Sequence, residues 1–145
     1  VELLCQSSAQ PLGRVLEIGT GCGYQAAVLS RVAREVYSIE RIRALHDKAR
    51  DNLRALRVPN LHLILGDGMA GFAQGAPYAA IIAAAGGNDL PAAWIDQLAV
   101  GGRLVAPAVT AAGGQHLVVI DKTARGIVRT ELEAVHFVPL KSGLA

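Results

Sequence analysis

Short apolar runs alternate with stretches of helical periodicity along the first two thirds of the chain. Between residues 42 and 56, apolar side chains recur at helical spacing and leave arginine and lysine on the opposite face, which predicts an amphipathic helix. The apolar runs predict strands at 15–18, 36–39, 61–65, 78–82 and 103–106, and two further helices are predicted at 24–32 and 91–98. Such alternation is typical of a parallel sheet that is covered on both faces.

The last third of the chain changes character, because predicted strands follow one another without helices between them. Runs at 116–120, 127–132 and 135–138 favour an antiparallel addition at one edge of the sheet. The predicted fold is therefore α/β, a Rossmann-like, doubly wound, mostly parallel sheet with an antiparallel, strand-rich C-terminal edge. We expect residues 1–145 to form a single domain, since no repeat or linker interrupts them. Such sheets bind ligands beyond the carboxyl ends of their strands, where the strand order reverses.

Composition and charge narrow the classes of partner. The chain is 52% hydrophobic and 18% charged, which is typical of a globular protein and not of a disordered one. The net charge of +2 is small and dispersed, so no nucleic-acid partner is expected, and no apolar run approaches the ~20 residues of a membrane span. Cys5 and Cys22 lie far apart and the histidines are scattered, so neither a disulfide framework nor a metal site is predicted. Sparse cysteine favours a reducing compartment.

The run from Glu17 to Gly23 is the first candidate for ligand binding. Glycines at 19, 21 and 23 lie between a predicted strand and a predicted helix, which is the context that gives a glycine pattern functional value. The spacing is GxGxG, whereas dinucleotide sites have GxGxxG, and Tyr24 would crowd the position of the third dinucleotide glycine. With an acid on the preceding strand, this form is commoner in sites for S-adenosylmethionine. The amino-acid end of that cofactor needs backbone contacts and a carboxylate for its ammonium group.

Two further carboxylates follow the next two predicted strands. Glu40 can accept both hydroxyls of a ribose, and Asp67, within Gly-Asp-Gly, can accept a hydrogen bond from an adenine amino group. Taken singly, Glu40 could be a solvated charge at a strand end or pair with a neighbouring arginine, and Asp67 could be a turn residue. Because the three acids lie at the ends of three successive predicted strands, the pattern as a whole favours a ligand site, with S-adenosylmethionine ahead of a nicotinamide cofactor.

The loop after the fourth predicted strand, residues 83–87, reads Ala-Ala-Ala-Gly-Gly and offers no acid, base, thiol or metal ligand. Methyl transfer is an in-line displacement in which positioning lowers much of the barrier, and only a poor nucleophile also needs a base. A bare loop therefore suits a nucleophile that is already charged at neutral pH, such as a carboxylate.

The chain strongly resembles the protein-L-isoaspartate (D-aspartate) O-methyltransferases over nearly its whole length. The resemblance rests on residues 15–25, 38–42, 66–68, 76–82, 97–107 and 137–140. It implies a class I S-adenosylmethionine-dependent methyltransferase fold and a cytosolic (cytoplasmic) repair enzyme that methylates the free carboxylate of isoaspartyl residues in damaged proteins. We also expect a monomer. The resemblance also implies a role for each candidate residue: the methionine part of the cofactor would lie against Glu17, Gly19, Thr20, Gly21 and Gly23, the ribose against Glu40, and the adenine against Asp67 and Gly68.

Three departures from the family pattern concern the substrate side. Ala79 stands where the family usually has Asp, and 84–87 replaces a Thr-Ala-Ala-Pro-like loop. The family's Ser-containing motif would lie upstream of Val1, and Ser7 and Ser8 do not match it, so the catalytic residue stays unassigned and residues 1–145 alone are expected to transfer methyl groups poorly. Another methyltransferase of small molecules or proteins, and a non-catalytic cofactor-binding relic, stay open as alternatives.

Overall fold

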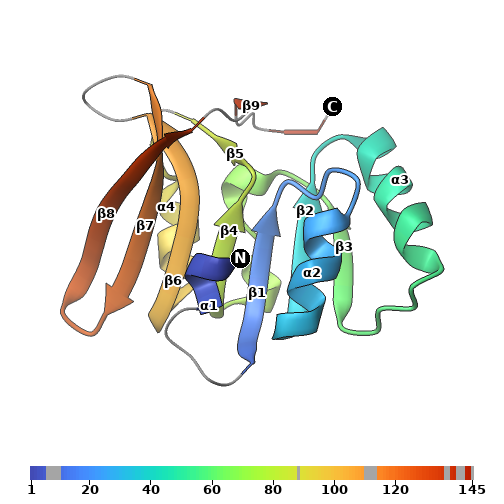
Figure 1. The fold of residues 1–145 in the computed structure, drawn as a ribbon, viewed down its shortest axis with the longest axis horizontal. Helices are drawn as coiled ribbons and strands as arrows, with labels where there is room; N and C mark the ends of the chain where they lie inside the picture. Colours follow the sequence, from blue (N-terminus) through green and yellow to red (C-terminus); the bar gives the residue numbers. More distant parts are fainter. Residues whose placement is uncertain (6–10, 88, 110–113, 136–137, 140–142, 145) are drawn as a thin grey trace.

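The computed structural model describes residues 1–5, 11–87, 89–109, 114–135, 138–139 and 143–144. Within these residues, a seven-stranded sheet has the order β3-β2-β1-β4-β6-β7-β8 (Figure 1). Its strands are β1 (Leu12–Ile18), β2 (Ala33–Glu40), β3 (Leu61–Leu65), β4 (Tyr78–Ala83), β6 (Leu98–Val109), β7 (Gln115–Thr123) and β8 (Gly126–Val135).

Strand direction divides the sheet into two parts. The five strands from β3 to β6 pair in parallel, whereas β7 is antiparallel to β6 and β8 is antiparallel to β7. The strand order reverses at β1, which pairs with β2 on one side and with β4 on the other. The predicted doubly wound sheet with an antiparallel C-terminal edge is confirmed.

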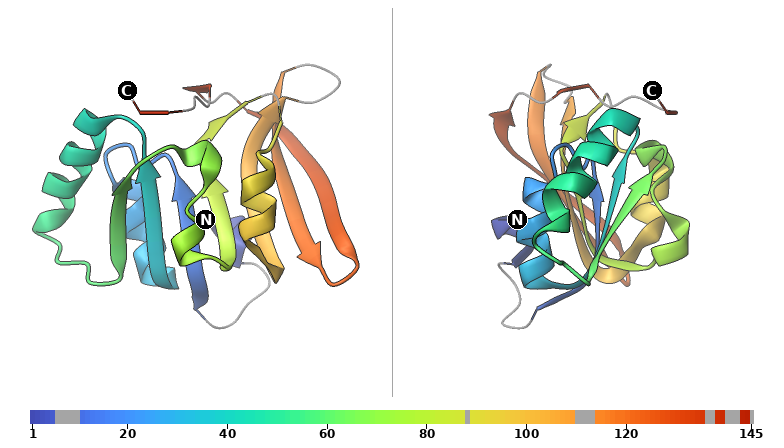
Figure 2. Two further views of the ribbon diagram at one scale, coloured as in Figure 1. Left: turned by 180° about the vertical axis from the view of Figure 1, so that it is seen from behind. Right: turned by 90° about the vertical axis from the view of Figure 1, so that its right-hand side faces the viewer.

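Helical segments cover both faces of the sheet. One face carries α1 (Glu2–Cys5), α2 (Tyr24–Val32) and α3 (Arg43–Arg54), and the other carries α4 (Ala92–Gln97) with the short 3₁₀ helices η1 (Gly68–Ala70) and η2 (Ala73–Gly75) (Figure 2). Val15 and Leu16 are both fully buried on opposite faces of β1, each in its own core cluster. This two-sided burial explains why the strands read as continuous apolar runs. None of the helices in the described part of the chain combines the length and apolar character of a membrane crossing.

The predicted start of β6 is wrong. The glycine pair 101–102 was expected to separate a helix from a strand at 103, but β6 begins at Leu98, directly after α4. The pairing of β4 with β6 shifts register between Tyr78 and Ala80, and a Cβ on Gly102 would lie 3.0 Å from the Ala79 carbonyl oxygen. The glycines are therefore part of an irregular strand in which two backbones approach closely.

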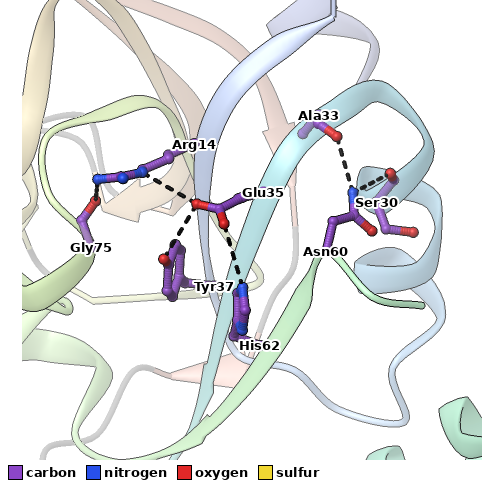
Figure 3. Close-up of polar contacts among 8 residues, drawn as sticks. All are labelled: Arg14, Ser30, Ala33, Glu35, Tyr37, Asn60, His62 and Gly75. Carbon is purple, nitrogen blue, oxygen red and sulfur yellow. Dashed lines mark hydrogen bonds and ion pairs between the residues drawn. The ribbon is translucent and has the colours of Figure 1, made fainter. Parts of the chain in front are cut away.

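Polar side chains join β1, β2 and β3 near their amino ends (Figure 3). The Glu35 carboxylate on β2 forms an ion pair with Arg14 Nε at 3.3 Å and lies 3.8 Å from His62 Nε2. The Tyr37 ring stacks on His62 with centroids 4.8 Å apart. His62 is thus a half-exposed strand histidine, as expected, and these contacts lie at the end of the sheet opposite to the predicted ligand site.

Asn60 connects the turn before β3 to the end of α2 (Figure 3). Its Nδ2 donates to the carbonyl oxygens of Ser30, at 2.8 Å, and Ala33, at 3.1 Å. The backbone carbonyl oxygen of Asn60 accepts from Val36 N at 2.9 Å. One side chain thereby satisfies two carbonyl groups at a helix-to-strand junction, where no helical partner remains for them.

We expect Asn60→Ala to lower the free energy of unfolding by about 1–3 kcal/mol, because two carbonyl acceptors lose their donor. Urea denaturation measures the change, with Gln74→Ala at an exposed position of η2 as the matched amide control. Equal stability of the two variants would show that solvent replaces Asn60 at this junction.

Candidate functional site

The carboxyl ends of β1, β2 and β3 meet at one edge of the sheet. Gly19 N donates to the Ile39 carbonyl oxygen at 2.8 Å, and Gly66 N donates to the Glu40 carbonyl oxygen at 3.0 Å. These bonds continue the parallel ladders by one residue beyond each strand. The structure therefore brings together the three segments that carry the predicted site residues: the glycine turn after β1, the end of β2 and the turn after β3.

The three glycines of the turn after β1 have different surroundings. All have positive φ, at +94° for Gly19, +57° for Gly21 and +93° for Gly23, so each needs the conformational freedom of glycine. A Cβ on Gly23 would lie 2.9 Å from Leu53 Cδ1 on α3, whereas a Cβ on Gly21 would meet nothing within 4 Å. Gly23 is thus needed for packing of the turn on α3, and the backbone at Gly21 is open for a ligand.

Glu40 bridges the glycine turn and the start of α3. Its side chain is 6% exposed, and Oε1 accepts from Gly21 N at 3.0 Å while Oε2 accepts from Ile42 N at 3.1 Å. The alternative of a solvated strand-end charge does not hold, because this carboxylate is buried. Each oxygen keeps a further lone pair for a ligand hydroxyl.

Asp67 and Gly68 form the turn after β3. Asp67 Oδ1 accepts from Met69 N at 3.0 Å and caps η1, so this residue does have the turn role that its sequence context allowed. Gly68 is buried, and a Cβ there would lie 2.7 Å from Ile18 Cγ2 on β1. The turn is therefore packed against the strand that leads into the glycine turn.

Two side chains of α4 form hydrogen bonds with the backbone of residues 68–72. Trp94 Nε1 donates to the Gly68 carbonyl oxygen at 2.7 Å. Gln97 accepts from Phe72 N through Oε1 at 2.8 Å and donates to the Ala70 carbonyl oxygen through Nε2 at 3.0 Å. Trp94 is the core residue that the sequence indicated, at 1% exposed, but it also fixes the backbone of a predicted site segment.

Glu17 is fully buried beneath the glycine turn and both of its oxygens have donors. Ser38 Oγ donates to Oε1 at 2.5 Å, and Gln25 Nε2 donates to Oε2 at 2.9 Å. Burial raises the pKa of the Glu17 carboxyl to about 7; the two hydrogen bonds oppose this rise, and the nearby Glu40 carboxylate adds to it. This acid therefore changes its charge near neutral pH.

The sequence indicated the acids and glycines of this site but not the side chains that hold them, which are Gln25, Ser38 and Gln97. Ser38 had a usable signal, because it lies two positions before Glu40 and so shares a face of β2 with it. Gln25 and Gln97 come from helices, and their partners cannot be inferred from spacing along the chain.

The loop after β4 is joined to the end of the chain. Ala84 N donates to the Ile18 carbonyl oxygen at 2.9 Å, and β5 (Ala85–Gly86) pairs in parallel with β9 (Val138–Pro139). Of the C-terminal stretch that carried the resemblance, residues 137 and 140 lie outside the described residues. The predicted bare loop is therefore part of a small second sheet beside the site, and its residues 84–87 contribute backbone groups but no ionisable side chain.

Comparison with known proteins identifies relatives along the whole chain. The family profile described as protein-L-isoaspartate(D-aspartate) O-methyltransferase matches residues 1–145. A protein-L-isoaspartate O-methyltransferase of Ralstonia nicotianae is 64% identical over 142 residues, which are 95% of this chain and 44% of that protein. One of Methylibium petroleiphilum is 63% identical over 139 residues, which are 92% of this chain and 52% of that protein. The chain thus spans about half the length of the curated relatives it matches.

Solved structures of proteins with the same name are also similar to this chain. A structure named protein-L-isoaspartate O-methyltransferase aligns with 93% of this chain and 44% of its own chain, with a TM-score of 0.84 and 31% identity. A beta-aspartate methyltransferase structure from Plasmodium falciparum, in complex with S-adenosyl-L-homocysteine, covers 91% of this chain and 67% of its own, with a TM-score of 0.76 and 26% identity. The methyltransferase fold expected from the sequence is confirmed.

The raised pKa of Glu17 predicts a stability that falls with increasing pH. The folded protein keeps the Glu17 proton up to about pH 7, whereas the unfolded chain releases it near 4.5, so ionisation favours the unfolded state over that interval. Relative to Glu17→Gln, the native protein should therefore lose on the order of 3 kcal/mol of unfolding free energy as pH rises through this window.

Urea denaturation at a series of pH values measures this difference. Glu131→Gln, at a half-exposed position of β8, is the matched control and should follow the native protein. Parallel stability curves for the native protein and Glu17→Gln would contradict the prediction, because they would show that Glu17 has its ordinary pKa in the folded state.

Proposed function

This chain belongs to the protein-L-isoaspartate (D-aspartate) O-methyltransferase family, and from that premise we propose that it transfers a methyl group from S-adenosylmethionine to the free carboxylate of L-isoaspartyl or D-aspartyl residues in damaged proteins. Residues 1–145 would act as a single cofactor-binding domain. The observation that carries the proposal is an open glycine turn between two buried acids, Glu17 and Glu40, with the turn after β3 packed against β1.

The residues of this edge fit the cofactor. Open space above Gly21 admits the amino-acid part, which would lie along Gly19, Thr20, Gly21 and Gly23 over the buried Glu17. Glu40 would accept the ribose hydroxyls through the lone pairs that Gly21 N and Ile42 N leave unused. Asp67 and Gly68 would lie at the adenine, where the free oxygen of Asp67 can accept from its amino group.

A nicotinamide cofactor fits the glycine turn less well. The position after Gly23 is Tyr24, the first residue of α2, whose side chain is 77% exposed. A dinucleotide site uses the helix start to bind a pyrophosphate and needs a small residue there. S-adenosylmethionine has no phosphate and supplies instead a methyl group bound to a positively charged sulfur.

The protein's task in this reaction is to bind, orient and exclude water. An isoaspartyl carboxylate is ionised at neutral pH, so it needs no general base. The Ala and Gly residues of 84–87 leave room for the peptide and offer backbone groups to orient it, in line with the positional demands of an in-line displacement. The small net charge of +2 and the sparse cysteines support action in the cytoplasm on proteins and peptides, without a nucleic-acid or membrane partner. A monomer is part of the same proposal.

Glu40→Gln and Asp67→Asn should each weaken binding of S-adenosylhomocysteine by about tenfold or more, because each removes a charged acceptor. Asn at 67 keeps an oxygen for Met69 N, whereas Gln at 40 keeps an oxygen for only one of the two donors Gly21 N and Ile42 N. Isothermal titration calorimetry measures the affinities. Glu35→Gln, near the amino end of β2, and Asp51→Asn, on the exposed face of α3, are the matched controls. Tighter binding of NAD than of S-adenosylhomocysteine by the native protein would overturn the cofactor assignment.

Transfer of a labelled methyl group to an isoaspartyl peptide should proceed with the full-length protein and fail with the normal aspartyl twin of that peptide. The two peptides have the same composition, so the comparison tests recognition of the displaced carboxylate. Equal labelling of both would indicate a general carboxyl methyltransferase. Binding of S-adenosylhomocysteine without any transfer would support the non-catalytic alternative.

A further inference from the structure

A chain of hydrogen bonds links the glycine turn to the buried acid. Thr20 Oγ1 lies 2.7 Å from Ser38 Oγ, which lies 2.5 Å from Glu17 Oε1, and Glu17 Oε2 accepts from Gln25 at 2.9 Å. Thr20, Ser38 and Glu17 are 4%, 0% and 0% exposed. Because Glu17 is wholly buried with both oxygens engaged, it reaches the turn through the two hydroxyl groups.

The charge of Glu17 determines which hydroxyl donates in each of these hydrogen bonds. A hydroxyl group has one proton to donate. When Glu17 is ionised, Ser38 must donate to it, so Thr20 must donate to Ser38 and has only acceptor lone pairs left for a ligand. The contact between Ser38 and Glu17 is a short hydrogen bond of 2.5 Å, a length that suits donation in either direction.

Protonation of Glu17 reverses the direction of donation along this series of hydrogen bonds. Oε2 already accepts from Gln25, so the proton lies on Oε1 and is donated to Ser38. Ser38 then donates to Thr20, and the Thr20 hydroxyl proton points away from Ser38. The Thr20 hydroxyl at the glycine turn therefore offers two acceptor lone pairs when Glu17 is ionised, but one lone pair and an outward proton when Glu17 is neutral.

We propose that Ser38 is a positioning residue that couples the protonation of Glu17 to the hydrogen-bond polarity of Thr20, and thereby makes binding of the cofactor's amino-acid end depend on pH. This rests on the proposed function, since it concerns the same site. The ligand carries an ammonium group, which requires acceptors. The form of Thr20 with two free lone pairs thus favours binding, and the form with an outward proton weakens it.

The surroundings of Glu17 support a titration in the physiological range. Burial raises the pKa of Glu17 to about 7. Glu40 at the end of β2 is the charged group that acts on it, and β4 places the apolar Ile82 beside it. From α2 it receives the uncharged Gln25, whereas Arg31, the charged residue of that helix, lies in the last turn.

The experiment measures binding of S-adenosylhomocysteine by calorimetry between about pH 6 and pH 8. For a carboxyl group with a pKa of about 7, the ionised fraction rises about tenfold across this range. We expect the affinity of the native protein to rise by up to about tenfold over the same interval, with release of a proton seen as a buffer-dependent binding enthalpy. The ligand's ammonium group keeps its charge throughout.

Ser38→Ala keeps the Glu17 carboxyl but removes the link to Thr20, so we expect its affinity to change less than about twofold between these pH values. Because it also removes a hydrogen bond that lowers the pKa of Glu17, a variant that leaves this bond in place is needed beside it. Ser30→Ala is the matched control, because Ser30 donates to the Ala27 carbonyl oxygen within α2, and it should behave like the native protein. Thr20→Val removes the outer hydroxyl of the series but keeps the hydrogen bond between Ser38 and Glu17, and its binding should also lose the pH dependence. Ser38→Thr keeps a hydroxyl at position 38 and should retain the pH dependence.

An undiminished pH dependence in Ser38→Ala or in Thr20→Val would overturn the coupling, because it would show that the charge of Glu17 acts through space. Native protein that binds with pH-independent affinity would overturn it as well. Absence of binding at every pH would instead contradict the proposed function, so the two failures are distinguishable. If Ser38→Ala does not fold, Thr20→Val carries the same test.

Discussion

β1 pairs in parallel with β2 on one side and with β4 on the other, β2 pairs in parallel with β3, and these pairings place the candidate functional groups of the chain. Because all four strands point the same way, their carboxyl ends reach one edge of the sheet. The register sets Glu17 beside Ser38 and Ile18 beside Ile39, so the glycine turn begins level with the end of β2. A shift of one residue would turn Glu17 to the other face of the sheet.

Burial of carboxylates at this edge explains the polar side chains around it. A charged group taken out of water is costly unless donors replace its hydration. Glu40 receives two backbone N–H groups, and Glu17 receives one hydroxyl and one amide. The raised pKa of Glu17 shows that its two donors do not fully compensate for burial. The site thus contains one acid that changes its charge near neutral pH. Its burial lowers the free energy of unfolding, and the apolar clusters on both faces of the sheet offset this loss.

Much of this arrangement could be predicted from sequence because it depends on local patterns. The periodicity gave helix 24–32 and strand 61–65 with their observed bounds, and acids after successive strands marked one ligand edge. Contacts between distant segments could not be predicted in this way. The bond from Trp94 to Gly68 and the pairing of β5 with β9 depend on how the chain folds back in space. The start of β6 was wrong because glycine also serves inside a strand where backbones crowd together.

Trp94 is the one tryptophan of the 145 residues, and its indole N–H binds the Gly68 carbonyl oxygen at the turn that follows β3. The light emitted by an indole depends on the polarity and hydrogen bonding around its ring. The chain therefore has a built-in optical probe at the rim of its ligand edge, buried away from solvent at 1% exposed. Any event that displaces the Gly68 carbonyl group changes the emission spectrum of these 145 residues, so changes at this turn can be followed in solution without an attached dye.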